Sequence, residues 1–144
     1  MVFYDSDLDI AVLEFDSDEI PVLPFTAQDE PAQPKDPVAI LGYPLDGGFD
    51  VKSARIRAMQ TLRSPDIYGD GAVIREVFSL RGLVRPGNSG GPIVDSAGRV
   101  VGVVFAASVT DDDTGYALTA DQVSEAAGEG RTSETERSTE GCAG

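Results

Sequence analysis

The sequence predicts an all-β domain, either a barrel or a sandwich, that ends in one short helix. Short apolar segments rich in valine, isoleucine and leucine recur along the 144 residues, separated by Gly, Pro and Asp. One segment near the C-terminus carries both a helix N-cap and a glycine stop. A chain of this length with 41% hydrophobic residues can bury one sizeable core.

The strands are expected between these breaks in the pattern. The first is 9–15 (DIAVLEF), followed by a connection from Pro21 to Pro37 whose five prolines exclude a helix and predict an extended surface crossover. Segment 72–82 alternates apolar and polar residues, as a half-buried strand does, whereas 51–62 fits no period cleanly and is taken as a strand from its context. The other expected strands are 37–43, 98–107 and 116–118, with a hairpin turn over 109–115.

The C-terminal region divides into a helix and a tail. Thr119 is a good N-cap and Gly128 a good stop, which predicts a helix over 119–127. Residues 128–144 contain no large apolar side chain, so a disordered polar tail is expected there.

Charge and composition restrict the partners. With 25 acidic and 11 basic residues the net charge is -14, which repels phosphate backbones and excludes nucleic acid as a partner. No apolar run approaches the ~20 residues of a membrane span, and no targeting leader is recognisable. The single cysteine, Cys142, is either an exposed thiol or half of a disulfide whose partner lies outside this sequence.

A serine framed by glycines stands in the segment 84–94, VRPGNSGGPIV. The pattern G-x-S-x-G is also that of a nucleophile elbow, which requires a helix after the serine and a histidine downstream. Here Pro92 and a further strand follow Ser89, and the chain contains no histidine. The nucleophile elbow is therefore excluded.

The same residues satisfy G-[DN]-S-G-G-P, the nucleophile loop of chymotrypsin-like proteases. Gly87 can turn its N–H toward the same point as the N–H of Ser89, which would form an oxyanion hole for an attacked carbonyl. In this fold the triad follows the order His, Asp, Ser, so the acid is expected upstream of Ser89. Asp9, at the start of DIAVLEF, is the candidate that would hold the histidine tautomer.

Each feature also has a purely structural interpretation, a tight turn for Ser89 and a solvated strand cap for Asp9. Their order and their separation by β-type segments favour catalysis. Asp5, Asp7 and Asp9 imitate the start of a calcium loop, but Ile10 replaces the required glycine and no glutamate closes the loop. No metal and no other cofactor are expected.

These motifs, together with YDSDLDIAVL, VAILGYPLDGGF and DTGYALTADQV, resemble the trypsin-like serine proteases, in particular the MarP-type acid-resistance periplasmic proteases of actinobacteria. The resemblance extends from Tyr4 to Ala127 and implies the second, six-stranded barrel of the two-barrel chymotrypsin-like fold. Residues 1–36 would then be a remnant of the first barrel with the inter-barrel connection, 37–127 the second barrel with its helix, and 128–144 the tail.

The resemblance also implies what would lie outside the sequence: a catalytic histidine before residue 1, a cysteine that pairs with Cys142, and membrane helices that anchor an extracytoplasmic protease. It places Leu83 at the base of the primary specificity pocket and the segment Phe105-Ala106-Ala107 along its wall, which predicts apolar or aromatic P1 residues. Asn88 stands where digestive relatives carry an aspartate that pairs with a freed N-terminus, so zymogen activation by that route is not expected.

The sequence therefore predicts a serine endopeptidase that acts on proteins or peptides, present here as a fragment that is inactive without its histidine. The alternative is a non-catalytic module that captures extended peptides along the apolar edge of segment 9–15.

Overall fold

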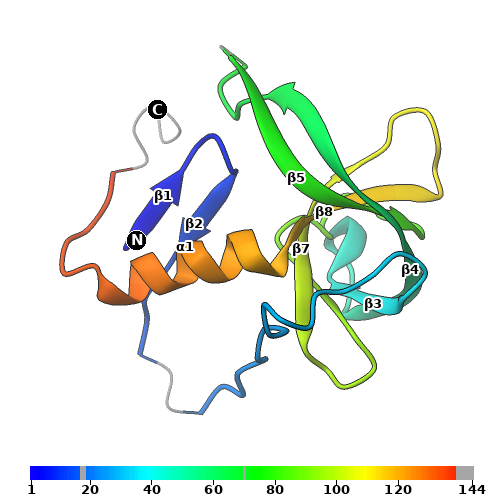
Figure 1. The fold of residues 1–144 in the computed structure, drawn as a ribbon. Coiled ribbons are helices and arrows are strands. Elements are labelled where there is room, and N and C mark those ends of the chain that lie inside the picture. The colour runs from blue at the N-terminus through cyan, green and yellow to red at the C-terminus, as the bar shows by residue number, and fades with distance from the viewer. Residues whose placement is uncertain (17–18, 70, 139–144) are drawn as a thin grey trace.

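A six-stranded barrel and a smaller unit of two strands and one helix lie side by side in this protein (Figure 1). The structure, a computed structural model, describes residues 1–16, 19–69 and 71–138. Its elements are β1 (Phe3–Asp5), β2 (Ile10–Val12), β3 (Pro37–Gly42), η1 (Pro44–Asp46), β4 (Asp50–Pro65), β5 (Ala72–Arg81), β6 (Pro92–Val94), β7 (Val100–Ala107), β8 (Thr114–Thr119) and α1 (Ala120–Thr132).

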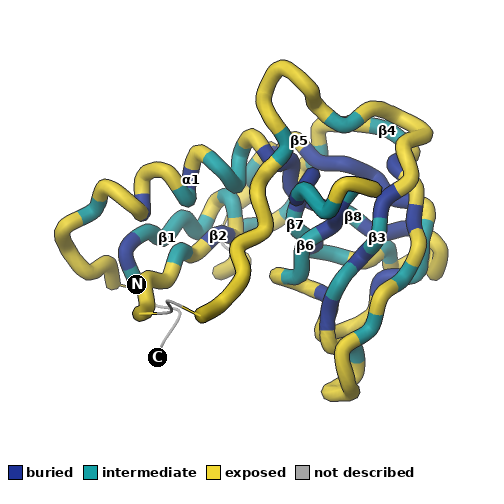
Figure 2. The backbone as a smooth tube through the Cα atoms, turned by 90° about the horizontal axis from the view of Figure 1, so that it is seen from below, coloured by how far each residue is buried: buried dark blue, intermediate teal, exposed yellow. Residues whose placement is uncertain are grey.

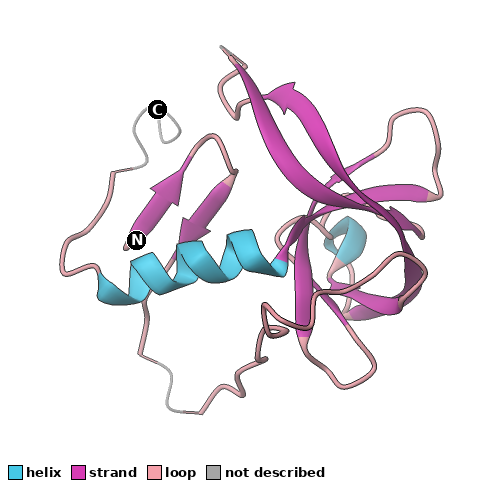
Figure 3. Cartoon of the chain, viewed as in Figure 1, coloured by secondary structure: helices cyan, strands magenta, loops and turns pink. Residues whose placement is uncertain are grey.

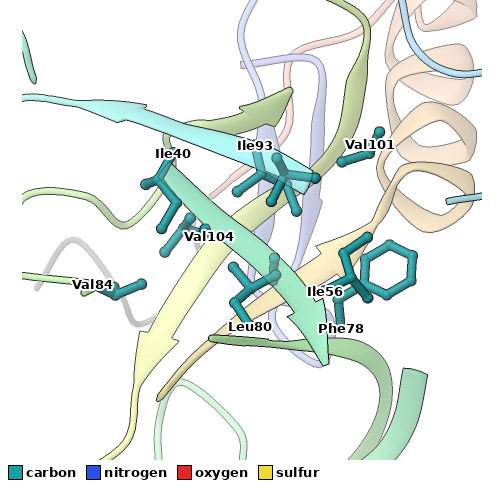
Figure 4. Close-up of a cluster of buried hydrophobic side chains, with 11 residues drawn as sticks. Ile40, Ile56, Phe78, Leu80, Val84, Ile93, Val101 and Val104 are labelled. Carbon is teal, nitrogen blue, oxygen red and sulfur yellow. The ribbon is translucent and has the colours of Figure 1, made fainter. Parts of the chain in front are cut away.

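The barrel closes in the order β3-β4-β5-β8-β7-β6, with every neighbouring pair antiparallel. Strands β4 and β5 are the longest and extend beyond the barrel as a twisted hairpin (Figure 3). Branched apolar side chains fill the interior, and Figure 4 shows them gathered between the strands. The most deeply buried among them are Ile40, Ile56, Leu80, Ile93, Val101 and Val104. A sheet closed in this way has no free edge along the barrel.

The proline-rich connection between β2 and β3 runs along the outside, as expected from its composition, and is exposed over most of its length (Figure 2). Its middle is tied to the start of β7, where Val100 accepts a hydrogen bond from Thr26 N–H (2.9 Å) and donates one to Pro24 O (2.8 Å). A nearby ion pair joins Arg99 Nη1 to Glu30 Oε2 at 3.0 Å.

The smaller unit packs on the barrel through a second apolar cluster. Ile10 from β2, Val77 from β5, Leu118 from β8 and Ala126 from α1 are all buried in it. Helix α1 lies along the β1–β2 sheet, and the loop between these two strands points toward the barrel (Figure 1). This cluster fixes where the loop that carries Asp9 stands.

The structure confirms the all-β class and the terminal helix, and it corrects three details. Segment 9–15 forms only the short strand β2, which is paired along one edge with β1, a strand that the sequence did not predict. The barrel's sixth strand, β6, has no strand-like pattern of its own and is recognisable only from its pairing with β3 and β7.

The third correction concerns the helix, which continues through Gly128 to Thr132, so residues 128–132 are helical and not part of a tail. Gly130 is buried, and a Cβ there would lie 2.8 Å from Val12 Cγ1. The helix reaches this far because the missing side chain lets it approach β2, a tertiary contact that overrides the low helix propensity of glycine. Cys142 lies outside the described residues.

No helix among the residues that the structure describes is long and apolar enough to cross a membrane.

Two glycines of α1 provide a matched test of this packing. A Cβ at Gly128 meets nothing within 4 Å, so Gly128→Ala should stabilise the protein by roughly 0.5–1 kcal/mol through helix propensity. Gly130→Ala gains the same propensity but forces the helix away from Val12, and we expect a net loss of about 1 kcal/mol or more. Urea denaturation of both variants measures the difference, and equal stabilisation by the two would show that α1 does not press on β2.

Candidate active site

The loop that carries Ser89 is folded around the buried side chain of Asn88, which is 3% exposed. Asn88 Oδ1 accepts a hydrogen bond from Arg85 N–H (2.9 Å), and the Asn88 N–H donates to Arg85 O (2.9 Å). Because Asn88 points inward, the next residue, Ser89, is turned toward solvent. The sequence indicated only that Asn88 does not pair with a freed N-terminus. The structure shows that its side-chain amide instead holds the loop together from inside.

Gly87 has a backbone conformation that requires glycine. Its φ is +92°, and a Cβ would lie 2.6 Å from the carbonyl oxygen of Tyr43. Within the described part of the chain, neither the Gly87 N–H nor the Ser89 N–H donates to a protein acceptor. Two free N–H groups on either side of one residue are the donors that an oxyanion hole needs.

Strand β7 holds the serine from the other side. The Ser89 hydroxyl donates to Phe105 O at 3.4 Å, a long hydrogen bond that leaves the hydroxyl easy to redirect. Gly90 N–H donates to Val104 O (2.8 Å), and Val104 N–H donates to Gly91 O (2.9 Å). The loop is therefore fastened to the barrel at the two residues that follow Ser89.

Asp9 ends the turn that joins β1 to β2. Asp5 Oδ1 accepts hydrogen bonds from the N–H groups of Asp7 (2.8 Å) and Leu8 (2.9 Å), which bends the chain back on itself. Asp9 then adopts a left-handed conformation with φ 60°, which aspartate tolerates better than most residues. Ile10 is buried directly after it, so the backbone at Asp9 is fixed on both sides.

Asp9 and Ser89 line the same cavity, although 80 positions separate them in the sequence. Its volume is about 450 Å³, and its other walls are mostly apolar: Ile10, Ala11, Val103, Val104, Phe105, Leu118 and Val123. A second, larger cavity of about 870 Å³ lies on the other side of Ser89, against the side chains of Ile20, Pro21, Leu23, Leu41, Tyr43 and Phe49. The structure thus brings together the two residues that the sequence singled out and places open space on both sides of the serine.

The electrostatics of Asp9 are set by two opposing effects. Partial burial raises the pKa of the Asp9 carboxyl above its ordinary value of 3.8, and the positive charge of Arg75 acts against this increase. Arg75 is 3% exposed and was not recognised in the sequence. The signal that could have revealed it is its position in the alternating strand β5, on the same side as the buried Val77.

The four residues predicted to form the specificity pocket are not all together. Phe105 lines the cavity shared by Asp9 and Ser89, whereas Leu83, Ala106 and Ala107 line neither of the two cavities beside the serine. Their role as a specificity pocket stays a prediction. Across 1–16, 19–69 and 71–138, no group of acidic, histidine or cysteine side chains could hold a metal ion.

The barrel and the site define a class of protein: the chain belongs to the trypsin-like peptidase domain family, which matches residues 1–103. It is 45% identical over 124 residues to the serine protease Rv3671c of Mycobacterium tuberculosis, a match that covers 85% of this chain and 31% of that protein. The chain thus spans less than a third of the length of this curated relative.

Solved structures agree with this assignment. The active form of Rv3671c from M. tuberculosis matches with a TM-score of 0.88 and 41% identity, over 96% of this chain and 60% of that one. Its inactive form gives a TM-score of 0.76 with 43% identity, over 88% and 63% of the two chains. The HtrA-type protease AlgW with a decapeptide gives 0.73 with 26% identity, over 86% and 37%. The predicted family and chymotrypsin-like fold class are both confirmed.

The raised pKa of Asp9 leads to a prediction about stability. Because the folded-state pKa lies above 3.8, ionising Asp9 disfavours the folded state, and Asp9→Asn removes that penalty. The advantage of the variant should be smallest in acid, grow as the pH rises through the folded-state pKa of Asp9, and then level off. Urea denaturation of both proteins from about pH 3 to about pH 7 measures it.

Asp7→Asn is the control, since Asp7 is exposed on the same turn. If Asp9→Asn and Asp7→Asn show the same pH dependence, burial of Asp9 has no effect on its ionisation.

Proposed function

We propose that this chain is the nucleophile-bearing portion of a serine endopeptidase, with Ser89 as nucleophile, the N–H groups of Gly87 and Ser89 as oxyanion hole, and Asp9 as the acid that orients a histidine. The observation that carries the proposal is the single cavity lined by Asp9 and Ser89. Asp9 would accept a hydrogen bond from one ring nitrogen of that histidine, and the other nitrogen would face Ser89.

The reaction then follows from the geometry. The histidine takes the proton of the Ser89 hydroxyl, and Ser89 Oγ attacks the peptide carbonyl. The oxyanion that forms accepts hydrogen bonds from the two free N–H groups. The histidine gives its proton to the departing amine, and a water molecule, activated in the same way, hydrolyses the acyl-enzyme.

The base has to come from outside this sequence, because the chain contains no histidine. We therefore propose that the chain alone hydrolyses peptides very poorly. A site that lacks one triad member keeps only the part of the rate that the oxyanion hole and substrate binding supply. The cavity of about 450 Å³ offers room for an imidazole ring between Asp9 and Ser89.

The proposed substrates are extended peptide segments that pass Ser89. The larger cavity beside the serine is walled by apolar and aromatic side chains, including Tyr43 and Phe49, whose ring centroids lie 5.6 Å apart. A relative of the same fold, AlgW, has been solved with a decapeptide. We keep Leu83, Phe105, Ala106 and Ala107 as the proposed P1 pocket and expect apolar or aromatic residues there.

The proposed arrangement of the whole protein follows the family resemblance. Residues 1–36 would be a remnant of the first barrel with the inter-barrel connection, and 37–127 the second barrel with its helix, in an extracytoplasmic protease anchored by helices outside this sequence. Cys142 would then pair with a cysteine that this sequence does not contain. Peptide mapping of the full protein under non-reducing conditions tests the pairing, and a free Cys142 thiol would contradict it.

The experiment that tests the catalytic proposal measures how fast a fluorophosphonate labels Ser89. The chain alone should react slowly, and added imidazole should accelerate the labelling. Co-expression with the histidine-bearing barrel of a relative should accelerate it by roughly 100-fold or more, the usual contribution of a general base.

Ser89→Ala should abolish labelling, and Asp9→Asn should remove most of the acceleration by imidazole. Labelling of the chain alone at the rate of an intact relative would disprove the need for an external base. Labelling that neither imidazole nor the added barrel accelerates would instead favour the non-catalytic peptide-binding module, although β2 is already paired with β1 along one edge.

A further inference from the structure

Arg75 is a buried arginine whose hydrogen bonds are incomplete. It projects from β5 on the side opposite the exposed Ile74 and Glu76, the same side as Val77, which is buried with Ile10 in the second apolar cluster. Its Nη1 donates to Ser64 Oγ and to Pro65 O (3.3 Å). Its guanidinium carbon lies 5.8 Å from the centroid of the Phe105 ring. Its Nε, also buried, has no hydrogen-bond partner among the residues that the structure describes.

A guanidinium group in such a place needs a negative charge. An arginine does not lose its proton at any ordinary pH, and an unpaired buried charge is strongly destabilising. Ser64, Pro65 and Phe105 supply only neutral oxygens and an aromatic face. None of them neutralises the charge.

Asp9 is the carboxylate whose ionised form the charge of Arg75 favours. Phe105 touches Arg75 through its ring, lines the cavity shared by Asp9 and Ser89, and accepts the Ser89 hydroxyl at its carbonyl oxygen. The charge of Arg75 also acts directly on the ionisation of Asp9. Through Phe105, Arg75 is thus linked to both proposed catalytic side chains.

We propose that Arg75 is a positioning residue for the acid of the triad: its fixed positive charge, held behind Phe105, keeps Asp9 ionised and turned toward the place of the histidine. This rests on the proposed function, because it assigns Asp9 the role of the acid. Asp9 must carry a negative charge when the histidine becomes an imidazolium, and the apolar walls of the cavity work against that charge.

The charged groups of Arg75 and Asp9 are not directly paired. Arg75 and Asp9 form no direct ion pair among the described residues, and Arg75 Nη1 donates to Ser64 and Pro65 instead. A bidentate pair with Arg75 would occupy both carboxylate oxygens and leave none for the histidine. A positive charge that is not directly paired with the carboxylate stabilises it and leaves both of its oxygens available.

Among the described residues, no other charged group stabilises the ionised form of Asp9. Of the charged groups in the described residues, only Arg75 acts on the Asp9 carboxyl. The other ionisable groups on the elements packed around it are mostly acidic or phenolic: Asp5 and Asp7 on the same turn, Tyr116 on β8, Glu76 on β5, and Asp121, Glu125 and Glu129 on α1. Two arginines also lie on these elements, Arg81 at the end of β5 and Arg131 in the last turn of α1, but both are exposed and neither acts on the Asp9 carboxyl. Among the described residues, removing Arg75 would therefore take away the positive charge that acts on the Asp9 carboxyl.

The test is a carboxyl NMR titration of Asp9 in this chain, which requires no catalytic activity. Arg75→Met keeps the length of the side chain and its contact with Phe105 but removes the charge, and we expect the Asp9 titration midpoint to move upward. Arg75→Lys restores a positive charge and should return the midpoint most of the way. Arg63→Met is the matched control, because Arg63 lies on the adjacent strand β4 with its side chain exposed, and it should leave the midpoint nearly unchanged.

Arg75→Met with an unchanged Asp9 midpoint and an intact amide spectrum would overturn the proposal. An equal shift in Arg75→Met and Arg75→Lys would also overturn it, since the cause would then be packing rather than charge. If Arg75→Met does not fold, Arg75→Gln replaces it as the uncharged variant. The Asp9 midpoint must then be higher in Arg75→Gln than in wild type and in Arg75→Lys.

An activity measurement separates this proposal from the proposed function. In the complex with a histidine-bearing barrel, Arg75→Met should move the acidic limb of the kcat/KM profile to higher pH with little change in KM, and Arg75→Lys should restore the profile. If no complex is active, the proposed function fails while the Asp9 titration still decides the role of Arg75.

Discussion

The apolar contact between the β1–β2 hairpin and the barrel is the interaction on which the rest of the site depends. Ile10 is buried against Val77 and Leu118, with Ala126 of α1 closing the cluster. Fully burying a side chain of this size stabilises the folded state by about 1.5–3 kcal/mol. Here it also fixes the position of the β1–β2 hairpin on the barrel. Asp9 immediately precedes Ile10, so the contact that buries Ile10 also decides where the carboxyl of Asp9 stands.

The two chemical groups are supported very differently. Ser89 stands on a loop fastened to a closed barrel by backbone hydrogen bonds to β7 and by the inward side chain of Asn88. Asp9 stands on a sheet of two three-residue strands, which is too small to be stable by itself. Helix α1 and the close approach of Gly130 to Val12 supply the missing support. The acid is therefore the side of the site that is more sensitive to changes far from the cavity.

The candidate residues that a local motif marks could be predicted from the sequence, whereas the features that depend on distant contacts could not. Ser89 and Gly87 stand in a motif whose glycines are required by the backbone, and Asp9 precedes an apolar strand. Strands β1 and β6 have three residues each, too few for a period to be visible, and exist through their partners. The end of α1 depends on Val12, more than a hundred positions earlier, and Arg75 looks like any surface arginine until its strand is placed under the hairpin.

If a histidine binds beside Asp9, as proposed, the ionisation of Asp9 is coupled to that binding. Without a histidine, the desolvated carboxylate has only the distant charge of Arg75 to stabilise it, and its pKa stays raised. A cationic ring placed between Asp9 and Ser89 would supply the second positive charge and lower that pKa. By linkage, the ionised form of Asp9 must bind such a ring more tightly than the protonated form does. Under the proposed function, binding of the base and ionisation of Asp9 would therefore favour each other, and this coupling would act in the cavity that Asp9 and Ser89 line.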